Sequence, residues 1–300
     1  MKISLVTPAG PGLRNGNRHT ALRWAAFLRA AGHRVAISTE DISDAADLML
    51  ALHARRSYPS IRNFSKKLVV ALTGTDIYRD IRTSPDARAS LEFADRLIVL
   101  QPKALDELPA RFRRKARVVV QSSATRLRHA PPKNTFRLCI IGHLRGEKDP
   151  LRTLAALAHV PGEVEVVHIG ALLDPNLKPE SGDPRYRWLG GLPHARALRW
   201  LASSHAMVIS SRMEGGANVV CEALRIGVPV LASRISGNVG LLGGRYPGYF
   251  PLEDTRALAM LIAKARDNRA FYATLKRQVA RLRPLVDPRR EARALLSAVL

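Results

Sequence analysis

The sequence predicts an α/β protein made of two doubly wound domains, each with a parallel sheet. Two observations carry this prediction: short β-branched segments alternate with amphipathic helical segments, and the alternation starts again after residues 122–137. In that segment Pro131 and Pro132 interrupt any helix, so we expect the interdomain linker there. We therefore expect an N-terminal domain at residues 1–130 and a C-terminal domain at 131–284, with a last helix at about 285–300 that can pack back on the first domain.

Eleven segments are expected to form the strands of the two sheets. In the first half they are residues 2–7, 34–38, 47–52, 67–72, 96–100 and 117–120, and in the second half residues 137–142, 164–169, 186–189, 206–210 and 229–232. Between the first two strands, Ala21, Leu22, Ala25 and Leu28 recur at helical spacing, and Gly32 is expected to end that helix. Open parallel sheets bind ligands at the carboxyl ends of their strands, so we expect a central cleft that both domains face.

The composition excludes several classes of protein. No uncharged apolar run approaches the roughly 20 residues of a membrane span, and the first residues lack the apolar core of a signal peptide. We therefore expect a cytoplasmic protein without a membrane span. Cys139 and Cys221 each lie in an apolar stretch, which argues against a disulfide framework and against a Cys/His metal site. No bound metal is expected.

The net charge of +23 would suit a nucleic-acid-binding protein, but the 48 Lys and Arg residues are spread along the whole chain. The densest cluster, from Arg111 to Arg117, contains a single aromatic residue, Phe112. A solvated helix end explains such a cluster better than a polyanion or membrane patch. We expect no specific nucleic-acid partner, and a positive field that draws anionic substrates toward the site.

The strongest chemical signal is the segment EGGANVVCE at residues 214–222, which follows a predicted strand and enters a helix through a glycine turn. Backbone N–H groups at the start of a helix can hold a phosphate. The two carboxylates of the segment repel phosphate and suit hydroxyl groups instead. We expect Glu214 to bind a sugar ring and Glu222 to bind a ribose diol.

A second group of polar residues follows the first, third and fourth strands, whose carboxyl ends meet at one edge of the sheet. Its basic and hydroxyl side chains predict a site for a small oxyanion. The expected acceptor-binding residues are Gly12, Arg14, Asn15, Asn17, Arg18, His53, Arg55, Thr73, Thr75 and Asp76. The glycines of the first loop miss the dinucleotide pattern G-x-G-x-x-G by one residue, and a dehydrogenase would not need the pair Glu214 and Glu222, so a dehydrogenase is disfavoured.

The motif EGGANVVCEALRIGVPVLAS resembles the donor site of retaining GT-B glycosyltransferases of family 4, with Ala217 where a second glycine is usual. The segment GHLRGEK at residues 142–148 is similar to the diphosphate-binding loop of that family. Lys148, at the start of a helix, matches directly, whereas either His143 or Arg145 replaces the usual arginine. The resemblance implies these donor-binding residues: His143, Arg145, Lys148, Glu214, Gly215, Gly216, Ala217, Asn218, Val219 and Glu222.

The segments TPAGPGLRNGNR, ALHARRS, VVALTGTDIYRD and GHLRGEKDPLRTLAAL further resemble the selenosugar synthases of selenoneine biosynthesis. This resemblance implies transfer of GlcNAc or glucose from a UDP-sugar to selenophosphate, with formation of a carbon–selenium bond. Lys148, Glu214 and His53 are the expected catalytic residues, and no cofactor is needed beside the two substrates. The donor sugar, the anomeric stereochemistry, the removal of phosphate from selenium and the oligomeric state stay open.

Two alternatives remain. The first is a family 4 glycosyltransferase that acts on an envelope glycan or lipid, for which the cluster near Arg113 would be a membrane contact. The second, from another class, is a polyanion-binding protein, which would explain the charge but leave Glu214, Glu222 and Lys148 without a role.

Overall fold

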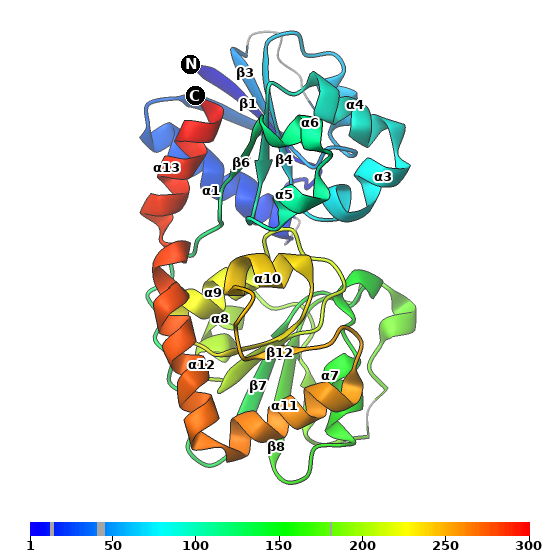
Figure 1. The fold of residues 1–300 in the computed structure, drawn as a ribbon, viewed down its shortest axis with the longest axis vertical. Helices are drawn as coiled ribbons and strands as arrows, with labels where there is room; N and C mark the ends of the chain where they lie inside the picture. Colours follow the sequence, from blue (N-terminus) through cyan, green and yellow to red (C-terminus); the bar gives the residue numbers. More distant parts are fainter. Residues whose placement is uncertain (13–14, 41–45, 181) are drawn as a thin grey trace. The chain divides into compact units, whose positions relative to one another are not determined.

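The computed structural model describes residues 1–12, 15–40, 46–180 and 182–300 (Figure 1). The chain divides into two compact units. The first unit consists of Met1–Gln121, Glu214–Asn218 and Pro288–Leu300, and the second unit consists of Ser122–Met213 and Val219–Asp287. The turn that begins the EGGANVVCE motif thus groups with the first unit, whereas the rest of the motif belongs to the second.

The first unit contains a parallel sheet of six strands in the order β2-β1-β3-β4-β5-β6. The strands are β1 (Lys2–Val6), β2 (Arg34–Ser38), β3 (Leu48–Leu52), β4 (Lys67–Leu72), β5 (Arg96–Val99) and β6 (Ala116–Val118). The strand order reverses between β1 and β3. In doubly wound sheets such a reversal leaves a crevice at the carboxyl ends of the two strands, where ligands bind.

Helices cover both faces of this first sheet. They are α1 (Gly16–Ala30), α2 (Tyr58–Ile61), the π-helix η1 (Asp76–Asp80), α3 (Ile81–Thr83), α4 (Pro85–Phe93), α5 (Ala104–Glu107), α6 (Ala110–Arg113) and α13 (Pro288–Val299). On one face, Trp24 and Leu28 of α1 share a hydrophobic cluster with Leu295 and Val299 of α13. The helical spacing predicted for α1 is confirmed, but Leu22 is 47% exposed and Trp24 is buried instead.

The second unit contains another parallel sheet of six strands, in the order β12-β11-β10-β7-β8-β9. Its strands are β7 (Phe136–Ile141), β8 (Val164–Ile169), β9 (Tyr186–Trp188), β10 (Ala206–Ile209), β11 (Val230–Ser233) and β12 (Tyr249–Phe250). Its helices are η2 (Gly146–Lys148), α7 (Arg152–Leu157), η3 (Pro175–Leu177), α8 (His194–Ala202), α9 (Asn218–Ile226), α10 (Ser236–Leu242), α11 (Thr255–Asp267), α12 (Arg269–Leu282) and η4 (Arg283–Val286). Here the strand order reverses between β7 and β10.

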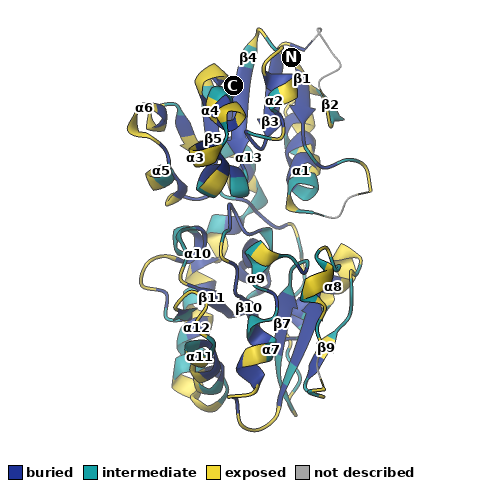
Figure 2. Cartoon of the chain, turned by 90° about the vertical axis from the view of Figure 1, so that its right-hand side faces the viewer, coloured by how far each residue is buried: buried dark blue, intermediate teal, exposed yellow. Residues whose placement is uncertain are grey.

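The predicted fold class is confirmed: both halves are doubly wound α/β units with parallel sheets. All eleven predicted strands are present, with ends that differ by at most two residues. Figure 2 shows that the central strands of the second sheet are buried. The short strand β12 is not predicted, because two residues carry no periodic signal. The cleft expected between the two domains stays a prediction.

Candidate functional site

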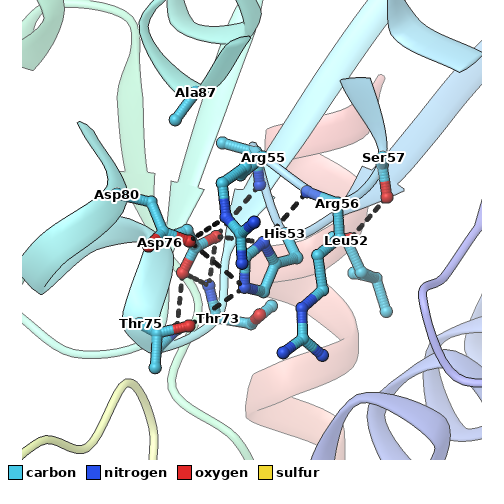
Figure 3. Close-up of polar contacts among 12 residues, drawn as sticks. Leu52, His53, Arg55, Arg56, Ser57, Thr73, Thr75, Asp76, Asp80 and Ala87 are labelled. Carbon is cyan, nitrogen blue, oxygen red and sulfur yellow. Dashed lines mark hydrogen bonds and ion pairs between the residues drawn. The ribbon is translucent and has the colours of Figure 1, made fainter. Parts of the chain in front are cut away.

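His53 directly follows β3, at the strand-order reversal of the first sheet, and its backbone has a φ of 77°. This left-handed conformation is uncommon for a residue other than glycine and is found mainly where surrounding contacts impose it. The ring is buried, and Nδ1 accepts a hydrogen bond from the backbone N–H of Arg56 at 3.3 Å. The proton therefore resides on Nε2, which donates to Oγ1 of Thr75 at 3.1 Å (Figure 3).

Asp76 joins the loops that follow β3 and β4. Its carboxylate is fully buried and accepts hydrogen bonds from four backbone N–H groups, those of Ala54, Thr73, Gly74 and Ile77. Such bonds compensate for the burial of the charge. Asp76 thus fixes the positions of His53 and Thr75, and its expected contact with an acceptor stays a prediction.

Asp80 lies at the end of the π-helix η1 and binds two arginines. Its Oδ2 accepts from Nε of Arg55 at 2.8 Å, and its Oδ1 accepts from Nε of Arg79 at 3.0 Å. Burial alone would raise the pKa of this carboxyl, but the hydrogen bonds from Arg55 and Arg79 outweigh it and lower the pKa. Asp80 is therefore ionised at neutral pH.

The other expected acceptor residues lie in the loop before α1 and after β4. Asn15 caps α1, with its Oδ1 accepting from the backbone N–H of Arg18 at 3.0 Å. Gly12 is exposed and has a φ of 86°, while Asn17 and Thr73 are half-buried. Arg14 lies outside the described residues. The structure brings His53, Arg55, Thr75 and Asp76 together, but it shows no direct bond that links them to Asn15, Asn17 or Arg18 among the residues it describes.

In the second unit, the loop Gly142–Lys148 follows β7, at the strand-order reversal of that sheet. Lys148 does not start a helix as expected, because it is the last residue of the short helix η2 and α7 begins only at Arg152. The reason is Asp149, whose left-handed φ of 44° separates the two helices. Arg145 is half-buried, and its Nε is buried with no hydrogen-bond acceptor among the described residues.

Three residues outside the expected site hold this loop, namely His168, Arg212 and Gly170. His168 donates from Nε2 to the carbonyl of Gly142 at 3.0 Å and accepts at Nδ1 from the hydroxyl of Tyr186 at 2.6 Å. Burial lowers the pKa of His168 to about 4, so the ring is neutral. Arg212 donates to the carbonyls of Gly146 and, through its backbone N–H, Glu147. The third residue, Gly170, directly follows β8.

Gly170 lies against the start of the loop. A Cβ atom placed on it would be 1.9 Å from the carbonyl oxygen of Gly142, so no other residue fits there without movement of the loop. The next residue, Ala171, donates its backbone N–H to Nδ1 of His143 at 3.0 Å. This bond orients the His143 ring.

The EGGANVVCE motif has its two carboxylates in different surroundings. Glu222 lies on α9 within the second unit, where its Oε1 is 2.7 Å from Nε2 of His194, at the start of α8. Glu214 is buried in the first unit. In that unit Asn218 accepts from Nη2 of Arg23 at 3.1 Å, and Gly215 and Gly216 are tightly packed.

Two further residues of the motif are Ala217 and Val219. Ala217, where the resemblance implies a glycine, has a left-handed φ of 35°, and Val219 is half-buried. An alanine in that conformation carries strain that a glycine would not, which is the physical reason why glycine is favoured there.

Within the described ranges 1–12, 15–40, 46–180 and 182–300, no three His, Cys, Asp or Glu residues are grouped so that they could hold a metal ion. In the same ranges, the helices are all too short or too polar to span a membrane. Cys139 and Cys221 are buried, and they are not joined in a disulfide bond.

Comparison with known proteins gives a family match for part of the chain. Residues 135–268 match the family described as glycosyl transferases group 1. This range contains the loop Gly142–Lys148 and the whole EGGANVVCE motif.

Solved structures match the fold over nearly the whole chain. Sucrose-phosphate synthase (tll1590) from Thermosynechococcus elongatus is 17% identical, with a TM-score of 0.76 and coverage of 99% of this chain and 97% of that chain. Anabaena Alr3699/HepE, determined in complex with UDP-glucose, is 16% identical, with a TM-score of 0.76 and coverage of 99% and 98%. The lipopolysaccharide outer core galactosyltransferase WaaB is 14% identical, with a TM-score of 0.66 and coverage of 99% of both chains. The fold is GT-B.

Proposed function

Since residues 135–268 match the family described as glycosyl transferases group 1, we propose that this chain transfers a sugar, GlcNAc or glucose, from a UDP-sugar to selenophosphate. The structure of Anabaena Alr3699/HepE in complex with UDP-glucose supports a UDP-sugar as the donor. The oxyanion chemistry of His53, Arg55, Thr75 and Arg79 supports a small anionic acceptor. The resemblance of the N-terminal segments to selenosugar synthases favours selenophosphate as that acceptor.

The donor diphosphate is proposed to bind at the loop Gly142–Lys148. Lys148 places a point charge where negative charge grows on the leaving diphosphate, which lowers the barrier to departure. Arg145, rather than His143, is proposed to replace the usual arginine. The Nε of Arg145 has no acceptor among the described residues, whereas Nδ1 of His143 is occupied by the backbone N–H of Ala171.

Glu222 is proposed to accept hydrogen bonds from the ribose hydroxyls of the donor, and Glu214 from the sugar. Oε1 of Glu222 contacts the exposed His194 ring in the structure, so the diol must replace this contact to bind both carboxylate oxygens. The second oxygen of the carboxylate gives the diol a further acceptor.

One observation carries the acceptor assignment: Arg55 and Arg79 both bind the buried carboxylate of Asp80. Selenophosphate is already anionic at selenium near neutral pH, so a strong general base is dispensable. Selenium attacks the anomeric carbon, the carbon–selenium bond forms, and the bond from that carbon to the diphosphate oxygen breaks. UDP leaves with the electron pair, and the product is a glycosyl selenophosphate.

Mass spectrometry of the products tests this proposal. The purified protein is incubated under reducing conditions with selenophosphate and, in separate reactions, UDP-GlcNAc or UDP-glucose. A selenium isotope pattern at the mass of a glycosyl selenophosphate or selenosugar is expected, together with an equal amount of UDP. Transfer to glycans or lipids, with no reaction or inhibition by selenophosphate, would contradict the acceptor and leave the glycosyltransferase assignment.

A further inference from the structure

We infer that Asp80 is a positioning residue, which holds Arg55 and Arg79 as a paired binding site for the phosphoryl group of the acceptor. The inference rests on the proposed function for the acceptor and adds to it the residue that orients the site. Asp80 lies outside the candidate residues expected from the sequence.

The first argument is the bonding geometry. Each carboxylate oxygen of Asp80 accepts one hydrogen bond from the Nε atom of a different arginine, at 2.8 Å from Arg55 and at 3.0 Å from Arg79. A guanidinium group has five N–H donors, and the Nε bond uses one of them. One carboxylate thus fixes two guanidinium groups next to each other, and their terminal nitrogen atoms can form the forked contacts that phosphoryl oxygens favour.

The second argument is the order of burial and charge. The side chain of Asp80 is 4% exposed, whereas those of Arg55 and Arg79 are 40% and 46% exposed. The carboxylate lies behind the guanidinium groups, so an anion from solvent meets positive charge first. Two arginines on one ionised carboxylate leave a net charge of about +1, which attracts an anion.

The third argument is the irregular backbone beside this pair. His53 has a φ of 77°, and Asp80 ends a π-helix, a form that is frequently found at functional sites. His53 Nε2 donates to Thr75 Oγ1, so the Thr75 hydroxyl can donate its own proton to a ligand. Strained backbone and donors thus occur within a few residues of the arginine pair, at the carboxyl edge of the sheet.

The chain contains a matched control for a purely structural ion pair. Glu165 also binds two arginines, Arg137 at 2.7 Å and Arg187 at 3.1 Å, in the second unit. It is the second residue of β8 and so lies near the amino end of its strand, away from the edge where ligands bind. Glu165→Gln therefore removes the same chemistry without touching the proposed site.

Equilibrium binding of thiophosphate, a stable oxyanion of similar shape, tests the inference without turnover. Titration calorimetry or ³¹P line broadening is expected to show binding about tenfold weaker or more in Asp80→Asn, with UDP affinity unchanged. In turnover, the selenophosphate KM is expected to rise by about tenfold or more, while kcat changes by less than about threefold. Asp80→Glu should restore part of the affinity, and Glu165→Gln should match the wild type. Circular dichroism checks that each variant is folded.

The outcomes separate this inference from the proposed function. If the wild type turns over selenophosphate and Asp80→Asn has an unchanged KM, the positioning role is wrong and the proposed function stands. If selenophosphate never reacts but thiophosphate binds and requires Asp80, the inference stands and the proposed acceptor is wrong. A third outcome would overturn the inference. In it, the wild type binds vesicles that contain phosphatidic acid, Asp80→Asn does not bind them, and neither protein binds thiophosphate, so the site would recognise a phosphorylated lipid instead of a free phosphoryl group.

Discussion

Trp24 donates its indole hydrogen to Oε1 of Glu291 at 2.7 Å, which joins α1 to α13 across 267 positions of the sequence. The same carboxylate accepts from Nε of Arg23 at 2.9 Å. Glu291 is 1% exposed, so its charge is stable only because these donors surround it. The C-terminal helix is therefore held on the first unit by a buried ion pair as well as by apolar packing.

Removal of this carboxylate should destabilise the first unit. Glu291→Ala leaves Nε of Arg23 and the Trp24 indole without the acceptor that Glu291 provides, and we expect it to lower the free energy of unfolding by about 3 kcal/mol. Urea unfolding followed by tryptophan fluorescence measures the change. As a control, Asp106→Ala removes an exposed pair with Lys103 and should cost less than about 1 kcal/mol. Equal effects of the two variants would refute the structural role of Glu291.

A methyl group at Gly170 should disturb the donor loop. In Gly170→Ala the new Cβ would overlap the carbonyl of Gly142, so the loop Gly142–Lys148 must shift. We expect a loss of about 1 to 3 kcal/mol in stability and weaker UDP binding, measured by thermal unfolding and calorimetry. Gly244→Ala is the control, because a Cβ there meets no atom within 4 Å. Wild-type UDP affinity in Gly170→Ala would show that the loop does not bind the donor.

Substitutions in the donor residues should separate binding from turnover. Glu222→Ala is expected to weaken UDP binding by about 1.5 to 3 kcal/mol, because a hydrogen-bonded carboxylate is lost. Lys148→Ala should reduce kcat more than donor affinity, because its charge acts on the leaving diphosphate. Calorimetry and steady-state kinetics measure both, with the exposed Glu163→Ala as a control. Unchanged UDP affinity in Glu222→Ala would remove that residue from the site.

Burial of His168 should make stability depend on pH. Its pKa is lowered from 6.5 to about 4 in the folded protein, so the unfolded chain binds the proton more tightly between these values. The contribution of His168 to the free energy of unfolding is complete above pH 6.5. It is lost as the pH falls toward 4, and the total loss is about 3 kcal/mol.

Urea unfolding at several pH values measures this effect. In His168→Gln the free energy of unfolding should fall less between pH 6.5 and pH 4 than in the wild type. Part of the decrease should remain, because burial also lowers the pKa of His205 to about 4. At pH 8 the difference in free energy of unfolding between the variant and the wild type reflects only the lost hydrogen bonds to Gly142 and Tyr186. An identical pH dependence in the variant and the wild type would contradict the assigned pKa.

The fold was predictable because its signals are local. A strand such as β4 is a short run of β-branched and aliphatic residues, and the glycine that ends α1 has a left-handed φ of 87°. The loop Gly142–Lys148 was also recognisable, since its glycine and lysine occur at a fixed spacing. The end of η2 at Lys148 was not, because it depends on the left-handed backbone of Asp149.

The sequence by itself determined two parallel α/β sheets and the residue types at the carboxyl ends of their strands, because strand periodicity and loop composition are properties of neighbouring residues. Only the tertiary structure decided which carboxylate meets which arginine. Asp80 is 25 positions from Arg55, and Glu291 is 268 positions from Arg23. These partners meet because the order of strands in the sheet, and the helix that returns to it, bring together segments that no local pattern connects.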